Sequence, residues 1–145
     1  MVGALAPFAP GGARLVWESR QARQSRYDGA AHLRFVREVV AGLPAEYPPG
    51  LVRQQRCVVV VDNYSVHHAK VVNAAMPELA AAGVEFFFLP PYSPELNLIE
   101  TAWRHIKYEQ MPERSYASAD GLQAAVEAAM TAYAHSRATL RASSV

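Results

Sequence analysis

Residues 56–62 read RCVVVVD, a run of β-branched side chains that ends on a carboxylate. Four consecutive valines leave no polar face, and such a run is typical of a strand buried on both faces of a parallel sheet. A second apolar run, VEFFFL at residues 84–89, predicts a second buried strand. Between the two runs, residues 68–82 have helical periodicity but contain Pro77, so we expect a kink or two short helices there.

The flanking segments predict a hairpin and three further helices. Apolar segments at residues 2–8 and 13–19 lie on either side of a Pro-Gly-Gly sequence and predict a β-hairpin with a long loop. Helices are predicted at residues 28–43, with Asp28 as N-cap and Gly42 near the end, at residues 98–108 and at residues 118–136. The apolar residues that we expect to face the core of these helices are Leu33, Val36 and Val40; Ile99, Trp103 and Ile106; and Leu122, Val126, Met130 and Tyr133.

Length and composition favour one globular domain. The chain has 145 residues, of which 51% are hydrophobic and 19% charged, enough for a real core. An opening hairpin followed by alternating strands and helices predicts an α/β layer with a mixed sheet. Few Gly and Pro residues and a single Cys exclude collagen-like, disordered and disulfide-rich classes. We expect no membrane span and no secretion signal, and the lone Cys57 fits the reducing cytosol, so we expect a cytoplasmic protein.

Positive charge is concentrated in the first part of the chain. The net charge is +1, but residues 1–57 carry eight Arg against four acidic residues. Arginine suits phosphate better than lysine does, because its planar guanidinium offers a fork of donors. A basic surface around residues 14–37 could therefore hold DNA, although an ordinary solvated surface is the better explanation for any single Arg.

Two acidic positions could carry chemistry. Asp62 closes the valine run and is followed by Asn63, His67 and His68. Either these side chains form a local turn, or Asp62 lies where open α/β sheets bind ligands, beyond the carboxyl ends of the strands. Glu100 lies three residues after Asn97, the spacing of a capping box, which explains it without any catalytic role. The intervening PPYSP, at residues 90–94, could also be a proline-rich docking segment.

Taken together, Asp62 and Glu100 could converge beside the sheet. Mg²⁺ takes oxygen ligands at roughly 2.0–2.1 Å and keeps several waters, so a few carboxylates suffice. Two such ions roughly 3.5–4 Å apart can activate an attacking hydroxyl and stabilise the leaving oxygen in phosphoryl transfer.

The stretches VVVVDNYSVHHAK and FFFLPPYSPELNLIETAWRHIK resemble the catalytic domain of DDE transposases, specifically the bacterial insertion-sequence branch of the mariner-type superfamily. The resemblance covers most of the chain. It implies an RNase H-like mixed sheet flanked by helices, in which three acids bind two Mg²⁺ or Mn²⁺ ions and cut and join DNA strands. By this likeness Asp62 is the second acid and Glu100 the third. The positions that it assigns to support of the acid loop or to DNA contact are Asn63, His67, Tyr92, Asn97, Arg104 and Lys107.

The sequence departs from the family pattern in two ways. Leu98 stands where the family usually has Pro, which relaxes the start of the following helix. In the family, the first acid lies on a strand upstream of the hairpin, and neither Glu18 nor Asp28 ends a strand at the matching place. The helix-turn-helix region that precedes such domains is missing as well. We therefore expect an N-terminally truncated transposase or the downstream product of a split reading frame, inactive by itself.

The missing strand also has a structural consequence. It is central in an RNase H-like sheet, lying between the hairpin and the valine strand, so its loss leaves two interior edges unpaired. We expect the chain to be poorly stable unless a homo-oligomer or an upstream-frame polypeptide supplies a strand.

Two further functions stay open at this stage. One is a non-catalytic module that uses the arginine-rich residues 14–37 to bind DNA or a full-length transposase. The other is an unrelated hydrolase that holds Zn²⁺ through Asp62, His67 and His68, because Zn²⁺ accepts imidazole readily.

Overall fold

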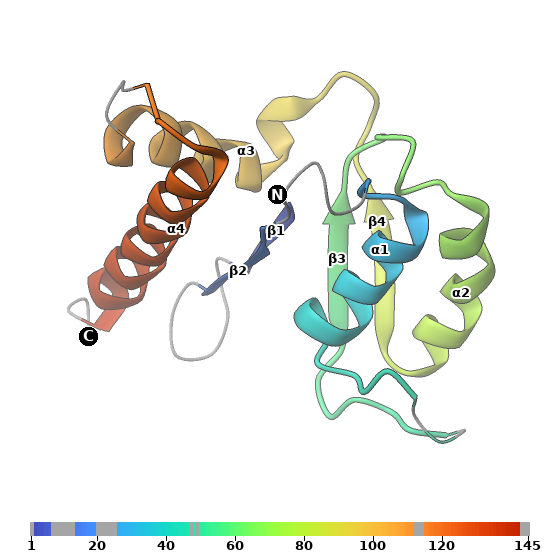
Figure 1. Ribbon diagram of the computed structural model, residues 1–145. Coiled ribbons are helices and arrows are strands. Elements are labelled where there is room, and N and C mark those ends of the chain that lie inside the picture. Colours follow the sequence, from blue (N-terminus) through green and yellow to red (C-terminus); the bar gives the residue numbers. More distant parts are fainter. Residues whose placement is uncertain are drawn as a thin grey trace. The chain divides into compact units, whose positions relative to one another are not determined.

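The computed structural model describes residues 2–6, 14–19, 26–46, 48, 50–111 and 115–142, with side chains described as far as residue 136. Two compact units make up the chain and are described separately. One consists of Met1–Ser25 with Leu98–Val145, and the other of Arg26–Asn97. Each unit combines a two-stranded sheet with helices, which confirms the α/β class (Figure 1). No helix among the described residues is both long enough and apolar enough to cross a bilayer.

Both apolar runs of the Arg26–Asn97 unit are strands. β3 (Cys57–Val61) and β4 (Val84–Phe88) pair in parallel, with Cys57 opposite Val84 and Val61 opposite Phe88. Because parallel neighbours need a crossover connection, α2 (Lys70–Ala81) lies between them in the sequence. The predicted strands and their parallel pairing are confirmed.

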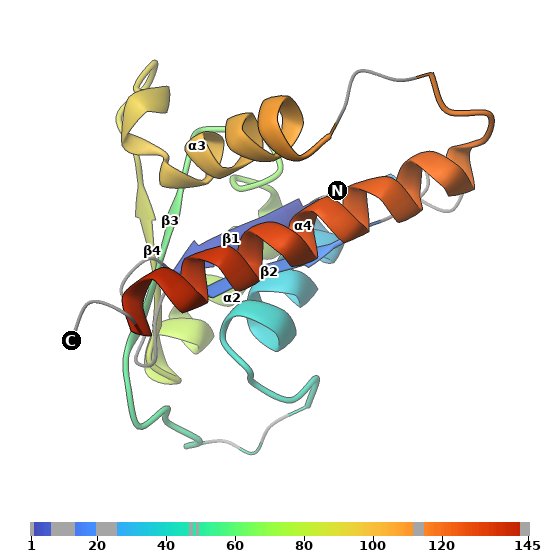
Figure 2. The same ribbon diagram turned by 90° about the vertical axis from the view of Figure 1, so that its left-hand side faces the viewer.

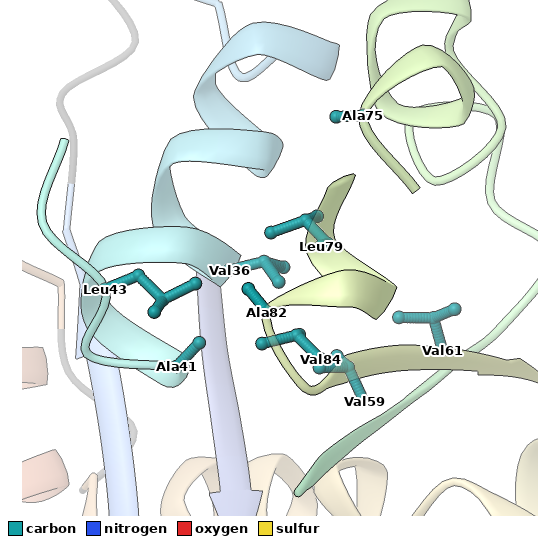
Figure 3. Packing of buried hydrophobic residues seen from close by; sticks show 9 residues of the cluster. All are labelled: Val36, Ala41, Leu43, Val59, Val61, Ala75, Leu79, Ala82 and Val84. Carbon is teal, nitrogen blue, oxygen red and sulfur yellow. The ribbon is translucent and has the colours of Figure 1, made fainter. Parts of the chain in front are cut away.

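Helices cover one face of this sheet. α1 (Gly29–Arg34), its continuation η1 (Phe35–Val40) and α2 pack on the side to which Val59 and Val61 point (Figures 1 and 3). The buried cluster between them is wholly apolar and consists of Val36, Ala41, Leu43, Val59, Val61, Ala75, Leu79, Ala82 and Val84.

The opposite face of the sheet is open, so the prediction that both strands are buried on both faces is wrong. Val58 is 59% exposed, Val60 50% and Phe87 56%. Side chains alternate across a strand, and the helices that pack on the sheet lie on the other side. β3 also pairs with β4 alone among the described strands.

The helix predicted at residues 28–43 is present, but its second half is a π-helix. Asp28 is its N-cap, because its carboxylate accepts a hydrogen bond of 2.9 Å from the amide of Ala31. From Phe35 to Val40 the backbone is a π-helix, and the amide of Ala41 donates to the carbonyl of Val36 at 2.8 Å. Gly42, at φ 63°, adopts the left-handed conformation that ends the helix.

Pro77 does not divide the second helix, so of the two predicted outcomes, a kink or two short helices, the division into two helices is wrong. α2 is one continuous helix from Lys70 to Ala81. Val72, Ala75 and Leu79 are all buried on its core side, and they lie on both sides of Pro77. Packing of both halves against one core explains why the helix continues despite the amide hydrogen that proline lacks. The helix begins after His68, which lies in a turn.

The other unit contains the predicted hairpin. β1 (Val2–Ala6) and β2 (Arg14–Glu18) pair antiparallel, with Val2 opposite Glu18, while residues 7–13 lie outside the described part of the chain. α3 (Leu98–His105) continues as the π-helix η3 (Ile106–Gln110), and α4 (Ala119–Ala142) runs across the hairpin (Figure 2). The buried cluster contains Leu15, Ala102, Ile106, Ala129, Met130 and Tyr133, with Ile99, Trp103 and Val126 packed against it.

The prediction that Leu122 of α4 faces the core is wrong, because its side chain is exposed. The helix begins at Ala119, after Ser118, whose hydroxyl accepts a hydrogen bond of 3.0 Å from the amide of Gly121. Leu122 therefore lies in the first turn, one turn before Val126, where the packed side of the helix begins.

Candidate functional site

The carboxyl ends of β3 and β4 are tied together by main-chain and side-chain bonds. The amide of Leu89 donates to the carbonyl of Val61 at 2.9 Å, which extends the parallel ladder beyond the last strand residue. The side-chain amide of Asn63 donates to the carbonyl of Leu89 at 2.7 Å. The segment that follows β3 is thereby anchored to the end of its neighbouring strand.

Asp62 lies at this anchored end, and its carboxylate is held on one side. Oδ1 accepts a hydrogen bond of 3.0 Å from the amide of Tyr64 and lies 3.0 Å from Nδ1 of His67. The first of these is the local turn that the sequence left open. No partner of Oδ2 is found among the described residues, and the side chain is 47% exposed. One carboxylate oxygen is therefore oriented by the protein while the other remains available.

His67 binds Asp62 twice, since its Nδ1 also lies 2.9 Å from the main-chain carbonyl of Asp62. A ring nitrogen within reach of two oxygens carries the proton, so we assign the Nδ1–H form to His67. The side chain of His67 is mostly buried, and the residue therefore acts as a support for the acid rather than as a surface group.

His68 is turned toward a different set of partners. Its Nε2 lies 3.2 Å from Oδ1 of Asn63, and its ring stacks on Phe88 at a centroid distance of 4.5 Å. Within the described part of the chain, no three His, Cys, Asp or Glu side chains are grouped so as to hold a metal ion. The zinc site of Asp62, His67 and His68 is therefore wrong, because the two histidines serve separate contacts.

His32, on α1, packs against His67, and the sequence analysis did not predict this contact. His32 is 4% exposed, its Nδ1 lies 3.0 Å from the hydroxyl of Tyr27, and its ring lies 4.5 Å from that of His67. Burial, assisted by the nearby His67 and opposed by Asp62, lowers the pKa of His32 from 6.5 to about 4. One signal in the sequence could have indicated that His32 is buried. It lies four residues before Val36, on the helix face that was expected to be buried.

A glycine brings α1 close to the turn that carries the histidines. A Cβ atom on Gly29 would lie 2.3 Å from the Cβ of Ala69, which follows His68 directly. Such a distance is shorter than any real carbon contact, so this approach requires glycine at position 29. The sequence contains no pattern that indicates it.

Glu100 belongs to the other unit of the chain. It lies in the first turn of α3, as the sequence predicted. Its side chain is exposed and has no hydrogen bond or ion pair to any described residue. The convergence of Glu100 with Asp62 stays a prediction.

The remaining candidate residues are mostly on the surface. Tyr92, at φ 58°, is fully exposed in the turn after β4, and Asn97 is half-buried. Arg104 and Lys107 are exposed on α3 and η3, with Nζ of Lys107 5.1 Å from the centroid of the Tyr108 ring. Exposed cations and an exposed aromatic ring are chemically suited to contact with DNA.

The arginine-rich segment is only partly free to bind phosphate. Arg34 pairs with Glu38 at 3.6 Å, and Arg37 lies 4.0 Å from Glu78. Arg14 and Arg26 are exposed, whereas Arg20 and Arg23 lie outside the described residues.

Asp62 and Glu100, each in its own unit, offer oxygen donors of the kind that fits a hard divalent cation. Asp62 offers one available carboxylate oxygen, and Glu100 offers an exposed, unpaired carboxylate. Mg²⁺ and Mn²⁺ prefer such oxygen ligands. Among the described residues, neither acid belongs to a group of three His, Cys, Asp or Glu side chains that could hold a metal ion.

His32 should make the folded chain sensitive to acid. Its pKa is about 4 in the folded protein and 6.5 in the unfolded chain, so the unfolded chain takes up the proton first as the pH falls. Stability present above pH 6.5 should be lost progressively down to about pH 4, by on the order of 3 kcal/mol. Urea unfolding at several pH values should show this loss, and His32→Phe should remove most of it.

The exposed His135 provides the matched control for this measurement. His135→Gln should leave the pH dependence unchanged. An unchanged pH dependence in His32→Phe would show that another group is responsible.

Comparison with known proteins identifies one family to which the chain is similar. Residues 22–123 match the family described as DDE superfamily endonuclease, a region that contains both Asp62 and Glu100. Neither the curated proteins nor the solved structures gave a match. Endonucleases of this superfamily generally use divalent metal ions and act on DNA. Since the match covers more than half of the residues, the chain belongs to the DDE superfamily endonucleases.

Proposed function

We propose that this chain is the catalytic part of a transposase from the bacterial insertion-sequence branch of the mariner-type superfamily, with an RNase H-like fold. The observation that carries the proposal is the arrangement at the end of β3. There Asp62 is oriented by His67 and Tyr64, and Asn63 ties the same loop to β4. The family match over residues 22–123 supports the reaction class, which is the cutting and joining of DNA strands.

Asp62 and Glu100 are the two acids that we assign to the metal site. When bound, two Mg²⁺ or Mn²⁺ ions would activate the attacking hydroxyl and stabilise the leaving oxygen. The protein's contribution is to hold Asp62 with one oxygen bonded and the other available. His67 is a positioning residue, because it contacts the carboxylate and the main chain of Asp62. Asn63 positions the loop as a whole.

DNA contact falls to exposed residues that follow β4. Tyr92, Asn97, Arg104 and Lys107 combine an aromatic ring, an amide and two cations. The cations would neutralise phosphates, and the ring of Tyr92 could stack on an unpaired base.

The first acid of the family is not among the residues that we assign to the site. We propose that an upstream-frame polypeptide supplies it on an additional strand, and that these 145 residues do not cleave DNA by themselves. Among the described strands, β3 pairs with β4 alone, and this leaves its other edge available to an additional strand. A cytoplasmic location fits the free thiol of Cys57.

The activity can be tested by nicking of a supercoiled plasmid that carries the DNA flanking the coding sequence. The 145-residue chain alone should not nick it in Mg²⁺, whereas the chain with the upstream-frame polypeptide should. Asp62→Asn and Glu100→Gln should abolish nicking by this complex. His67→Ala should reduce the rate by roughly 10–100-fold, the usual cost of losing a group that supports a metal ligand.

Glu95→Gln is the matched control, because Glu95 is an exposed acid shortly before α3. It should leave the rate unchanged. Strong nicking by the chain alone that Glu100→Gln abolishes would contradict the proposed inactivity. Nicking that survives both Asp62→Asn and Glu100→Gln would contradict the proposed roles of these acids.

A second candidate function is a non-catalytic module that binds DNA or a full-length transposase through its arginines. The exposure of Arg14 and Arg26 favours it, although Arg34 and Arg37 have acidic partners. Phosphate contacts release counterions, so binding should weaken steeply as salt rises. Fluorescence anisotropy should show that Arg26→Ala lowers the slope of log affinity against log salt by about 1.

If the chain is such a module, Asp62→Asn should leave its DNA affinity unchanged. This result would distinguish binding through arginines from binding that depends on a metal ion. A salt-independent affinity, or an affinity lost in Asp62→Asn, would contradict it.

A further inference from the structure

Two exposed tyrosines follow the parallel strands of the Arg26–Asn97 unit. Tyr64 lies three residues after the end of β3 and is 63% exposed, and Tyr92 lies four residues after the end of β4 and is fully exposed. Because the strands are parallel, they end at the same edge of their sheet (Figure 1). Both tyrosines therefore belong to the loops at the edge that carries Asp62, and all three residues lie within one unit.

Tyr64 takes part in holding the acid. Its amide donates to Oδ1 of Asp62 at 3.0 Å, and its ring meets that of His67 in a T-shaped contact at a centroid distance of 6.1 Å. In the described part of the chain, its hydroxyl has no hydrogen-bond partner. Single exposed apolar side chains are common and imply no function by themselves. Tyr64 differs because the same residue that orients the carboxylate also presents an accessible ring beside it.

Tyr92 presents its ring from an unfavourable backbone conformation. Its φ of 58° is left-handed, a conformation that a residue with a Cβ atom rarely adopts. The hydroxyl of Ser93 donates to the carbonyl of Pro91 at 3.4 Å, which closes the chain around Tyr92. The bond from Asn63 to Leu89 ties this loop to the loop of Asp62. Since the Tyr92 side chain is fully exposed, it gains no packing from this conformation, and strain of this kind is typical of residues that contact a ligand.

The ligand that suits a flat ring beside this acid is a nucleobase. In the proposed function, Asp62 binds the phosphate that is cut. Successive nucleotides of a strand are spaced by roughly 3.4 Å along the helix axis, so the base next to this phosphate is close to a residue that is bonded to Asp62. Inside a duplex, neighbouring bases cover both faces of that base, and a protein ring can stack on it only when it has left the base stack.

We propose that Tyr64 stacks on an unpaired base next to the phosphate that is bound at Asp62. This inference rests on the proposed function and adds a substrate preference to it. DNA with unpaired bases at the point of cleavage binds better than fully paired DNA, whatever the bases are, because every base has a face on which an aromatic ring can stack. Tyr64 is thus a residue that determines specificity, whereas His67 and Asn63 position the acid.

Fluorescence anisotropy without divalent metal tests the stacking apart from cleavage. The probes are two labelled duplexes, one fully paired and one with a short central stretch of mismatched thymines. The unchanged chain should bind the mismatched duplex about tenfold more tightly, the usual gain from stacking one base on an aromatic ring. Tyr64→Leu should lose this preference, and Tyr64→Phe should keep it because the ring is retained. Phe87→Leu is the matched control, since it removes an exposed ring from the open face of the same sheet, and it should keep the preference.

Photocrosslinking shows where the unpaired base lies. Iodouracil in place of one mismatched thymine should form an adduct on Tyr64 in the unchanged chain, detected by mass spectrometry after digestion. Circular dichroism checks the folding of each variant, and leucine should be tolerated because Tyr64 is exposed in a turn.

Equal affinity of the unchanged chain for the two duplexes would overturn the proposal. So would a folded Tyr64→Leu variant that keeps the preference, or adducts that form only on residues other than Tyr64. These measurements involve neither metal nor cleavage, so they are independent of the nicking assay. If Asp62→Asn abolishes nicking but Tyr64→Leu keeps the preference, the proposed function stands and the stacking role of Tyr64 is wrong.

Discussion

The hydrogen bond from the side chain of Asn63 to the carbonyl of Leu89 ties the end of β3 to the end of β4, and the candidate site depends on it. Asp62 directly precedes Asn63, so the bond that anchors Asn63 also fixes the position of the Asp62 main chain, from which the carboxylate extends. His67 then orients one oxygen of Asp62, and His32 with Gly29 supports His67 from α1. The position of one acid thus depends on contacts from two strands and a helix, which is how a preorganised metal ligand is built.

Much of the fold could be predicted from local signals in the sequence. The valine run, the hairpin and the Asp28 cap depend on periodicity and turn chemistry within a few residues. The burial of the sheet could not be predicted this way. Whether Val58 and Val60 are covered depends on which elements pack on that face, and in this chain the helices that contact the sheet lie on the other face. Similarly, Pro77 predicts a break by its local chemistry, but packing of α2 against one core keeps the helix continuous.

The part of the candidate site that follows the end of β3 could be predicted from the sequence. The sequence places Asp62, Asn63 and His67 together, and the structure confirms that they contact one another or the same strand end. His32 was not predicted, because thirty residues separate it from Asp62 and only tertiary packing brings α1 to the turn. Its low pKa keeps His32 neutral at neutral pH, so His32 places no positive charge beside His67 and Asp62.

The central claim is that Asp62 and Glu100 bind the same divalent ions. Paramagnetic broadening by Mn²⁺ in nuclear magnetic resonance spectra tests this directly. The account predicts that amide signals around Asp62 and around Glu100 broaden at the same Mn²⁺ concentration, and that Asp62→Asn abolishes both effects. Broadening around one acid only, or broadening around Glu100 that persists in Asp62→Asn, would contradict it.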